Sequence, residues 1–579
     1  MTAPLESLKE LAFFRALGDA TCRAIAERGL WFSLAGGWEL FSQGARSQTL
    51  FFVLSGRLIV VRSGPNGDEV VGYVRSGEPV GEMSLLSGEA HSASVYALRD
   101  SEILALPQVD VEKLLKKNAE LAVALSRSVL SRARHPQASF QQSAPRVFAL
   151  VSTSPAIDID AVARRLQREI SRYGVRVLAL SEGEAETQYR SFETQEAAHD
   201  VVLLATKVGY TSWYQFALRH ADRFLVFARR DARPPRPFPL SLGEASAARQ
   251  FRLVDLVVVH EGLRTTSAAE WFDAIGANRI FHWRDETCIA RLARLIAGKS
   301  VGLVLSGGGA RAYAHIGAVK AIRERGVPID TISGASMGAV VAACVAMGWS
   351  DEEIERRIRQ AFVESNPLGD HVLPVVALTR GARVEERLRA NFGDALIEEL
   401  EIPFFCVSSE LTEGALRIHR MGLLRQALRA SVSLPGILPP VVEGDALLVD
   451  GAVIDNFPTG LMASAHRGVT IGIDVARRGT ISARDFAHPP DFFEWVLANG
   501  FSSAPPIVSL LMRAATAREE TMRTTHPADI LITPTIEGVE LRDWKRYDAA
   551  VSAGYAAAHL SLDQNWGALG QIAEAAKTQ

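Results

Sequence analysis

Cysteine is scarce in this chain, and the two signs of charge nearly cancel. Four cysteines occur among 579 residues, and no two of them form a C-x-x-C pair. This scarcity argues against a disulfide framework and a zinc ribbon, and it favours a reducing compartment. Lys and Arg number 63 against 66 Asp and Glu, which gives a formal net charge of -3. Such a balance provides no basic field, so we expect no nucleic-acid partner.

The sequence also lacks the segments that would export a protein or anchor it in a membrane. Its first residues contain no basic stretch followed by the apolar core of a secretory signal. The longest nearly uncharged apolar stretch, residues 334–349, is shorter than the ~20 residues that a spanning helix needs. We therefore expect a cytoplasmic protein that is free to contact the inner face of the membrane peripherally.

What is present is an ordinary globular composition in three blocks. Hydrophobic residues make up 48% and charged residues 22%, which excludes a mainly disordered chain. Residues 1–135 hold short apolar runs between glycines, typical of a β-roll or jelly roll, and end in helical sequence. In residues 140–295, strand-like runs alternate with helical stretches, which predicts a Rossmann-like α/β domain with a parallel sheet. The expected fold class is therefore multidomain α/β with an all-β N-terminal module, and residues 296–579 carry the candidate chemistry.

The third block opens with a glycine-rich turn between a strand and a helix. Residues 301–305 form a buried-strand run, Gly307, Gly308 and Gly309 follow, and helical sequence begins at residue 312. Backbone N–H groups in such a turn converge beside the positive end of the helix dipole. This arrangement suits a phosphate or the oxyanion of an acyl-transfer intermediate, although close packing alone also explains such a turn.

A second motif has the form G-x-S-x-G. Residues 334–338, GASMG, follow a short strand and open an apolar helix, which is the context of a nucleophile elbow with Ser336 pointing outward. The alternative is a helix start with Ser336 as a local cap. Asp450 lies at a strand end before Gly451. An Asp at such a place is usually a turn residue, but beside a serine elbow it becomes a candidate base.

In this order, the glycine loop, G-x-S-x-G and D-G-A resemble the patatin-like phospholipase family. The resemblance spans about residues 300–475 and includes residues 425–440, RQALRASVSLPGILPP, and the N-x-P stretch at residues 455–458. The order of the blocks resembles more narrowly the bacterial relatives of neuropathy target esterase, which carry cyclic-nucleotide-binding-like modules ahead of the esterase domain. Residues 543–554 resemble their C-terminal segment. The resemblance implies a patatin-like α/β/α esterase domain over residues 296–579.

The activity implied by the resemblance is a serine esterase that acts on lysophospholipids or phospholipids through a Ser–Asp dyad. Ser336 would attack the ester carbonyl, and Asp450 would accept its proton. The oxyanion hole would be lined by the amides of Gly307, Gly308, Gly309, Ala310 and Arg311. No metal or cofactor is expected, because serine, carboxylate and amides suffice for acyl transfer. Ala312 stands where the family commonly has glycine, which matters only if that position needs a positive φ.

Two rival interpretations stay open at this point. A Ser–Asp–His hydrolase is allowed by the order of the chain, since four histidines follow Asp450, namely His466, His488, His526 and His559. A catalytically dead ligand-sensing or scaffold protein is the other. For a lipid enzyme, residues 492–497, 501 and 507–512 are candidates for contact with lipid, with a core helix as the alternative.

The first block resembles a cyclic-nucleotide-binding domain. The match lies at Gly44, residues 54–56 and residues 81–86. In that family the Glu of the G-E pair holds the ribose hydroxyl, which would be Glu82, and a later Arg pairs the cyclic phosphate. His91, followed by Ser92, stands at the place of that Arg, and a neutral imidazole cannot replace a bidentate guanidinium. Glu82, His91 and Ser92 thus mark a candidate effector site, and we expect a degenerate sensor or docking module that binds cyclic nucleotides weakly.

Overall fold

The computed structural model divides the chain into two compact units, each described by itself. The first unit holds residues 1–171 and 175–279, and the second holds residues 172–174 and 280–579. The domain boundaries expected near residues 135–140 and 295 stay predictions. The residues that the structure describes are 8–9, 11–46, 49–64, 67–134, 145–184, 192–235, 238, 253–260, 267–373, 375–476, 528–536, 538–539 and 543–577.

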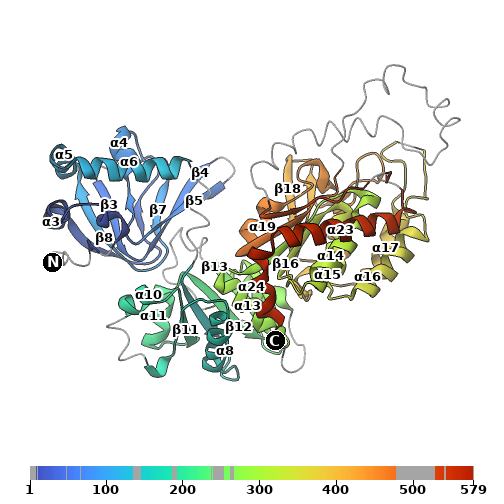
Figure 1. Ribbon diagram of the computed structural model, residues 1–579, viewed down its shortest axis with the longest axis horizontal. Helices are drawn as coiled ribbons and strands as arrows, with labels where there is room; N and C mark the ends of the chain where they lie inside the picture. Colours follow the sequence, from blue (N-terminus) through green and yellow to red (C-terminus); the bar gives the residue numbers. More distant parts are fainter. Residues whose placement is uncertain are drawn as a thin grey trace, which may run out of the picture. The chain divides into compact units, whose positions relative to one another are not determined.

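The first unit begins with two antiparallel four-stranded sheets, in the orders β1-β8-β3-β6 and β2-β7-β4-β5. The strands are β1 (Leu30–Leu34), β2 (Glu39–Phe41), β3 (Thr49–Ser55), β4 (Arg57–Gly64), β5 (Gly67–Arg75), β6 (Pro79–Val80), β7 (Ser94–Ala97) and β8 (Ser101–Pro107). The helices are α2 (Ala12–Arg15), α3 (Asp19–Arg28), α4 (Glu82–Ser87), α5 (Gln108–Lys117) and α6 (Ala119–Arg134). Figure 1 shows α4, α5 and α6 on one side of the roll. The predicted jelly-roll class is confirmed.

Alternation along β3 explains why this roll has two cores. Phe52 packs with Ile25 of α3 and Leu114 of α5, whereas its neighbour Val53 packs with Leu58 inside the roll. Successive side chains of a strand point to opposite faces, so one strand serves the helical layer and the roll interior at once. All of these side chains are almost fully buried.

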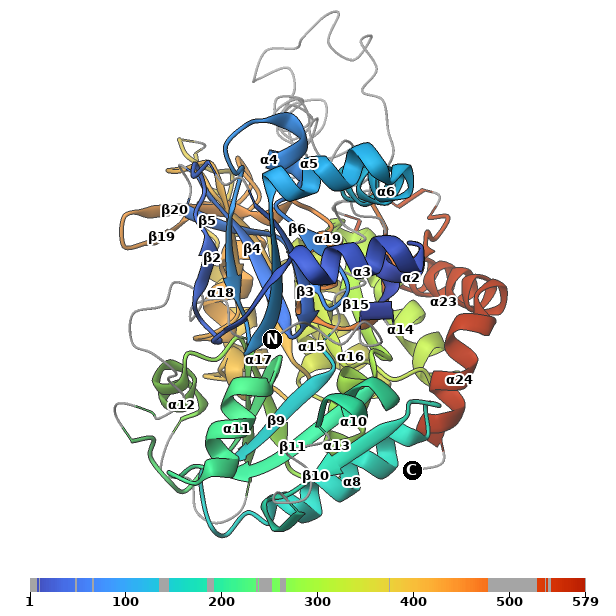
Figure 2. The ribbon, with the colours of Figure 1, turned by 90° about the vertical axis from the view of Figure 1, so that its left-hand side faces the viewer.

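The second part of the first unit is a parallel sheet, as predicted. Its strands follow the order β10-β11-β9-β12-β13, and every pair in that series is parallel. The strands are β9 (Val147–Ser152), β10 (Val177–Leu180), β11 (Val201–Lys207), β12 (Arg223–Arg229) and β13 (Leu253–Val259). The helices that accompany them include α8 (Ile159–Ser171), α10 (Phe192–Ala198), α11 (Ser212–His220) and α12 (Ala268–Ile275) (Figure 2). Strand β14 (Arg279–Trp283) runs across the point where the units divide.

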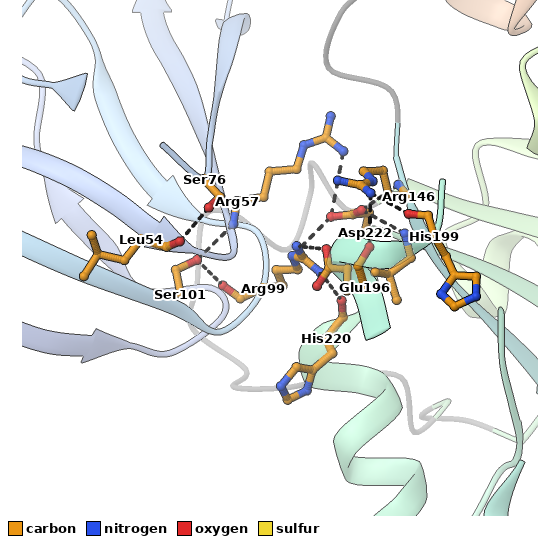
Figure 3. A network of polar contacts seen from close by, with 11 residues as sticks. Leu54, Arg57, Ser76, Arg99, Ser101, Arg146, Glu196, His199, His220 and Asp222 are labelled. Carbon is orange, nitrogen blue, oxygen red and sulfur yellow. Dashed lines mark hydrogen bonds and ion pairs between the residues drawn. The ribbon is translucent and has the colours of Figure 1, made fainter. Parts of the chain in front are cut away.

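A buried network of charges joins the two parts of the first unit (Figure 3). Arg57 of β4 and Arg99, just before β8, face the Oδ1 atom of Asp222 at 3.8 and 3.4 Å. Arg99 also donates to Glu196 of α10 at 2.6 Å. The Oδ2 atom of Asp222 accepts the backbone N–H of Arg146 at 2.8 Å. Burial alone would raise the pKa of Asp222, but the two arginines hold that pKa below its usual value. Replacing Asp222 would take this carboxylate from two buried arginines, and removing one partner of a buried pair typically costs about 3–5 kcal/mol.

The second unit is built on an eight-stranded mixed sheet. Its order is β19-β20-β17-β16-β15-β21-β22, with β18 paired to β17. The strands are β15 (Ser300–Leu305), β16 (Thr331–Ala335), β17 (Phe404–Glu410), β18 (Ala415–His419), β19 (Val441–Glu443), β20 (Ala446–Asp450), β21 (Gly468–Ile473) and β22 (Ile530–Ile532). Strand β15 is parallel to both β16 and β21, so the strand that leads into the glycine loop lies inside the sheet.

Helices cover this sheet and bring distant parts of the chain together. They are α13 (Glu286–Ala297), α14 (Ala314–Glu324), α15 (Ser336–Ala346), α16 (Asp351–Ile358), α17 (Ala382–Phe392), α18 (Leu424–Ser431), α19 (Thr459–Ala465), α23 (Tyr547–Gln564) and α24 (Trp566–Lys577). In Figure 1, α23 runs beside α14. A Cβ on Gly317 would overlap the carbonyl of Val551, and a Cβ on Gly554 would overlap the carbonyl of Ala314. Glycine on both helices therefore permits their backbones to touch.

No helix in the described ranges has both the length and the apolar character needed to cross a bilayer. The segments named above as candidates for lipid contact, residues 492–497, 501 and 507–512, lie outside the described residues.

Candidate active site

Ser336 lies in a sharp turn between β16 and α15. Its φ is 54°, and among the described residues it is the only non-glycine residue with a positive φ. Such a conformation costs an L-residue free energy, and it recurs where a side chain must be aimed at a reacting group. A Cβ on Gly334 would come within 2.7 Å of the Gly338 carbonyl carbon, and one on Gly338 would overlap the carbonyl of Ser306. Both flanking glycines are therefore required for the turn to close against β15.

Asp450 and Ser336 share a direct hydrogen bond. Ser336 Oγ donates to Asp450 Oδ2 at 2.6 Å, although the two residues are 114 positions apart. Asp450 ends β20, where its other oxygen accepts the Ala452 N–H at 2.9 Å. Its own N–H donates to the carbonyl of Ser433 at 2.9 Å. The backbone N–H of Ser336 donates in turn to Ser431 Oγ at 2.9 Å, so both members of the pair are fixed by the end of α18 and the residues that follow it.

Burial sets the protonation of this carboxyl group. Asp450 is fully buried, and desolvation raises its pKa from 3.8 to about 7, despite the opposing effect of the Ser336 and Ala452 hydrogen bonds. Among its described neighbours no Arg or Lys is paired with it. A carboxyl group with such a pKa exchanges a proton near neutral pH, which suits a general base.

The glycine loop passes directly beside the serine. The Cβ position of Gly307 lies 2.9 Å from Ser336 Cβ, so any side chain there would collide with the serine. Within the described part of the chain, the N–H groups of Gly308, Gly309 and Ala310 have no hydrogen-bond acceptor. The N–H of Gly307 donates to the Asn456 carbonyl at 3.2 Å, and that of Arg311 donates to the Gly308 carbonyl at 3.1 Å. Three of the five predicted oxyanion-hole amides are thus open to an incoming anion.

The loop leads into the short helix η4 (Gly309–Tyr313) and then into α14. Gly309 has a φ of 56°, which glycine adopts without strain. Ala312 has no positive φ, so alanine fits where the family commonly has glycine, as the sequence predicts. The unpaired amides therefore lie at the start of η4, which runs on into α14, and the helix dipole favours negative charge there.

Two residues that the sequence analysis did not assign hold the loop in place. Asn456 bonds Gly307 twice, because its carbonyl accepts the Gly307 N–H and its side-chain Nδ2 donates to the Gly307 carbonyl at 3.2 Å. His315 is fully buried, and its Nε2 donates to the Ser306 carbonyl at 2.8 Å. Burial lowers the pKa of His315 to about 4, so the ring is neutral. In the sequence, the only signal for Asn456 is the N-x-P stretch, and the only signal for His315 is its place at the start of an apolar helix.

The histidines of the rival triad do not contact Asp450 in the described part of the structure. His466 bonds Ser300 Oγ at 3.1 Å and Thr470 Oγ1 at 2.9 Å. Ser300 begins β15, and the catalytic end of that strand is five residues away, or roughly 16 Å at ~3.3 Å per residue. His559 on α23 lies 3.8 Å from Glu324, at the far end of α14. His488 and His526 lie outside the described residues.

The candidate effector site in the first unit is filled by the chain's own side chains. Glu82 begins α4, is 1% exposed, and pairs with Arg132 of α6 at 2.6 Å. His91 stacks on Phe41 with ring centres 3.8 Å apart, and its Nδ1 shares a hydrogen bond of 2.8 Å with Ser84. Desolvation lowers the pKa of His91, which keeps the imidazole uncharged. Ser92, the third predicted residue, is exposed.

Comparison with known proteins identifies two family domains in this chain. A patatin-like phospholipase domain matches residues 303–463, and a cyclic nucleotide-binding domain matches residues 31–118. An uncharacterized NTE family protein of Mycobacterium tuberculosis is 31% identical over 543 residues, which cover 90% of each chain. The human patatin-like phospholipase domain-containing protein 6 is 28% identical over 514 residues, 77% of this chain and 37% of that one. A solved cyclic nucleotide-binding domain from Methylobacillus flagellatus is 22% identical, covering 23% of this chain and 77% of that one, with a TM-score of 0.21.

Proposed function

Because the chain belongs to the NTE family and carries a patatin-like phospholipase domain, we propose that it hydrolyses acyl esters of lysophospholipids or phospholipids through a Ser336–Asp450 dyad. The class of enzyme, a lipid esterase, follows from the family. The observation that carries the dyad is the 2.6 Å hydrogen bond from Ser336 Oγ to Asp450 Oδ2. A serine in a strained elbow, bonded to a buried carboxyl group, has the nucleophile and the base that the reaction needs.

In the first half of the reaction, Ser336 Oγ attacks the ester carbonyl carbon while its proton passes to Asp450. The carbonyl oxygen becomes an oxyanion, which the N–H groups of Gly308, Gly309 and Ala310 are free to bind. Collapse of this intermediate breaks the bond to the alcohol, and the proton on Asp450 passes to the departing alkoxide. The acyl group stays on Ser336. Removing one such donor from an oxyanion hole typically costs about 10²–10³ in kcat.

In the second half, a water molecule attacks the acyl-enzyme. Asp450 takes a proton from the water and returns it to Ser336 Oγ as the fatty acid departs. The same carboxyl group thus accepts and donates a proton twice per turnover, which a pKa of about 7 permits at neutral pH. A carboxyl group of ordinary acidity would be a much weaker base in both steps.

We also propose that the N-terminal module acts on the enzyme without needing a cyclic nucleotide. The family match gives a cyclic nucleotide-binding domain, but the glutamate that would hold the ribose is paired with Arg132. His91 is uncharged, buried and stacked on Phe41, so it offers no guanidinium to a cyclic phosphate. Both observations agree with a regulatory or docking role. In this role, the ion pair between Arg132 and Glu82 holds α6 against the start of α4.

The dyad is tested by lipid hydrolysis and by covalent labelling. The variant Ser336→Ala should lose turnover of a panel of lysophospholipids and phospholipids and should no longer react with a fluorophosphonate probe. Ser333→Ala is the matched control, because Ser333 is a buried serine on β16, the strand that leads into the turn, and its hydroxyl has no described hydrogen-bond partner. This control should keep both turnover and labelling. Wild-type turnover in Ser336→Ala would refute the dyad and the enzyme assignment with it.

A further inference from the structure

The loop between η5 (Arg359–Val363) and α17 exposes large apolar side chains in a cluster. Leu373 is 83% exposed, Val375 is 91% exposed and Val376 is 66% exposed. Among the described residues, Tyr210 is the only large hydrophobic residue more exposed than Val375. Single exposed hydrophobic residues are ordinary, but three within four positions form a patch that needs a partner. These three residues are called the apolar tip below.

The apolar tip stands on a closed stem. His371 and Thr379 pair as an antiparallel bridge, and the Val372 N–H donates to the Leu378 carbonyl at 3.0 Å. The Arg380 N–H donates to the carbonyl of Asp370 at 3.0 Å. Hydrogen bonds between its two sides therefore close the stem of the loop. The exposure of the side chains is thus a property of a defined hairpin-like loop.

The stem is joined to the segment that holds the dyad. The Leu378 N–H donates to the Gly436 carbonyl at 2.9 Å, and Thr379 Oγ1 donates to the Ile437 carbonyl at 2.7 Å. A few residues earlier on the same segment, Ser431 binds the N–H of Ser336 and Ser433 binds that of Asp450. One short stretch of chain therefore connects the apolar tip to both members of the dyad.

The base of the loop carries exposed charges of both signs. Arg380 and Arg383 are exposed there, as are Glu385 and Glu386 at the start of α17. The nearby Asp370 is turned to the start of α17, where its Oδ2 accepts the Ala382 N–H at 2.8 Å. An apolar tip with a charged base matches the interface of a bilayer, in which acyl chains lie below head groups that carry both phosphate and cationic groups. The apolar tip and the charged base together complement a phospholipid surface. The surface of a protein partner does not in general have an apolar layer below a charged one.

We propose that Leu373, Val375 and Val376 insert into the surface of a phospholipid bilayer and dock the catalytic unit there. This proposal rests on the proposed function, since a lipid esterase must take its substrate from such a surface. The docked loop would hold the segment of Gly436 and Ile437 next to the membrane, and this segment also carries the contacts to Ser336 and Asp450.

The test compares binding and hydrolysis on two kinds of substrate. The full-length triple variant Leu373→Ser, Val375→Ser, Val376→Ser is mixed with vesicles of phosphatidylcholine and phosphatidylglycerol and separated by flotation. Burying each large side chain contributes roughly tenfold to a binding constant, so the triple variant should bind vesicles more weakly by at least about tenfold and by up to about a thousandfold when all three side chains insert fully. Its hydrolysis of vesicle lipid should fall in parallel. Hydrolysis of a soluble short-chain ester should not change, because the tip does not contact the dyad.

The matched control replaces three exposed hydrophobic residues of the same unit that are far apart in the sequence. These are Leu411, Val442 and Leu560, with exposures of 47%, 70% and 62%. Changing them to serine should leave vesicle binding intact. Ser336→Ala should bind vesicles like the wild type while hydrolysing nothing. Hydrolysis by this variant would contradict the proposed function, whereas vesicle binding tests the apolar tip separately.

Two results would overturn the proposal. One is equal vesicle binding by the wild type and the triple serine variant. The other is a wild-type dimer, seen by sedimentation, that the triple variant dissociates while vesicle binding stays unchanged, since the tip would then join two copies of the chain.

Discussion

Replacing Asp450 by Asn should abolish catalysis and stabilise the fold at the same time. Asn has almost the same shape, so its Oδ1 can still accept the Ala452 N–H and its Nδ2 can face Ser336 Oγ. What disappears is the base and its buried negative charge. Loss of a general base typically lowers kcat by about 10²–10⁴, and more where the base also activates the nucleophile.

The stabilisation follows from the raised pKa. The folded chain has a pKa of about 7 at Asp450 against 3.8 for an exposed carboxyl, so between these values it keeps a proton that the unfolded chain has released. Raising the pH through this window therefore weakens the wild-type fold by about 1.4 kcal/mol per pH unit. The accumulated loss is about 2 kcal/mol at about pH 5 and about 4 kcal/mol at about pH 8. Asn carries no charge, so the free energy of unfolding of the variant does not fall with pH in this way.

Calorimetry at the two pH values measures the effect. The Tm of the catalytic unit should be higher in Asp450→Asn by roughly 10 °C at about pH 8 and by roughly 5 °C at about pH 5. The control is Asp445→Asn, which removes an exposed carboxylate from the same hairpin and should leave Tm unchanged. In parallel, kcat/KM of the wild type should rise with pH and level off above about 7, because only ionised Asp450 accepts the serine proton.

A Tm difference that does not grow with pH would contradict the raised pKa of Asp450. A variant less stable than the wild type at about pH 8 would refute it as well. In either case, Asp450 would have to ionise in the folded chain at little cost in free energy. A different group would then set the acidic limb of the pH profile of kcat/KM.

Three further outcomes are expected. His466→Ala and His559→Ala should each keep most soluble-ester hydrolysis, with circular dichroism checking the fold; a loss as severe as that of the nucleophile variant would indicate a triad. Cyclic AMP and cyclic GMP at micromolar concentration should give no saturable rise in Tm, whereas His91→Arg should gain one if the missing guanidinium is the cause. Gly554→Ala should cost about 2–3 kcal/mol or more and lower activity, since a Cβ there overlaps the backbone of α14; Gly567→Ala, with open space around it, should be nearly neutral.

Local features of this fold could be predicted from the sequence. The strands and helices around the elbow depend on hydrophobic periodicity and on glycines next to one another, so residues 301–305 and Ser336 were placed correctly. The parallel sheet of the first unit was predicted for the same reason, because its strands are continuous buried runs. Asp450 was different. Nothing local ties it to a serine 114 positions away, and the resemblance to a family supplied that link.

Contacts between distant segments could not be predicted. The pairing of Glu82 with Arg132 spans 50 positions, and neither residue signals the other in sequence. His315 looked like any histidine in an apolar helix until its bond to the Ser306 carbonyl was visible. Residues 371–378 form an apolar run of a kind that a buried strand also has, yet the structure exposes Leu373, Val375 and Val376. Exposure depends on what else packs nearby, which a linear pattern does not contain.

The crossing of α14 and α23 has a consequence for how the catalytic unit is made. During synthesis the chain leaves the ribosome from its N-terminus, so β15, the glycine loop and α14 emerge before β21 and α23 exist. Until then one edge of β15 is unpaired and Gly317 has no helix against it. The first unit, which ends at residue 279, can fold in the meantime. The oxyanion loop should therefore become ordered only when residues 547–564 arrive, so that a partly synthesised enzyme releases no fatty acid into the cell.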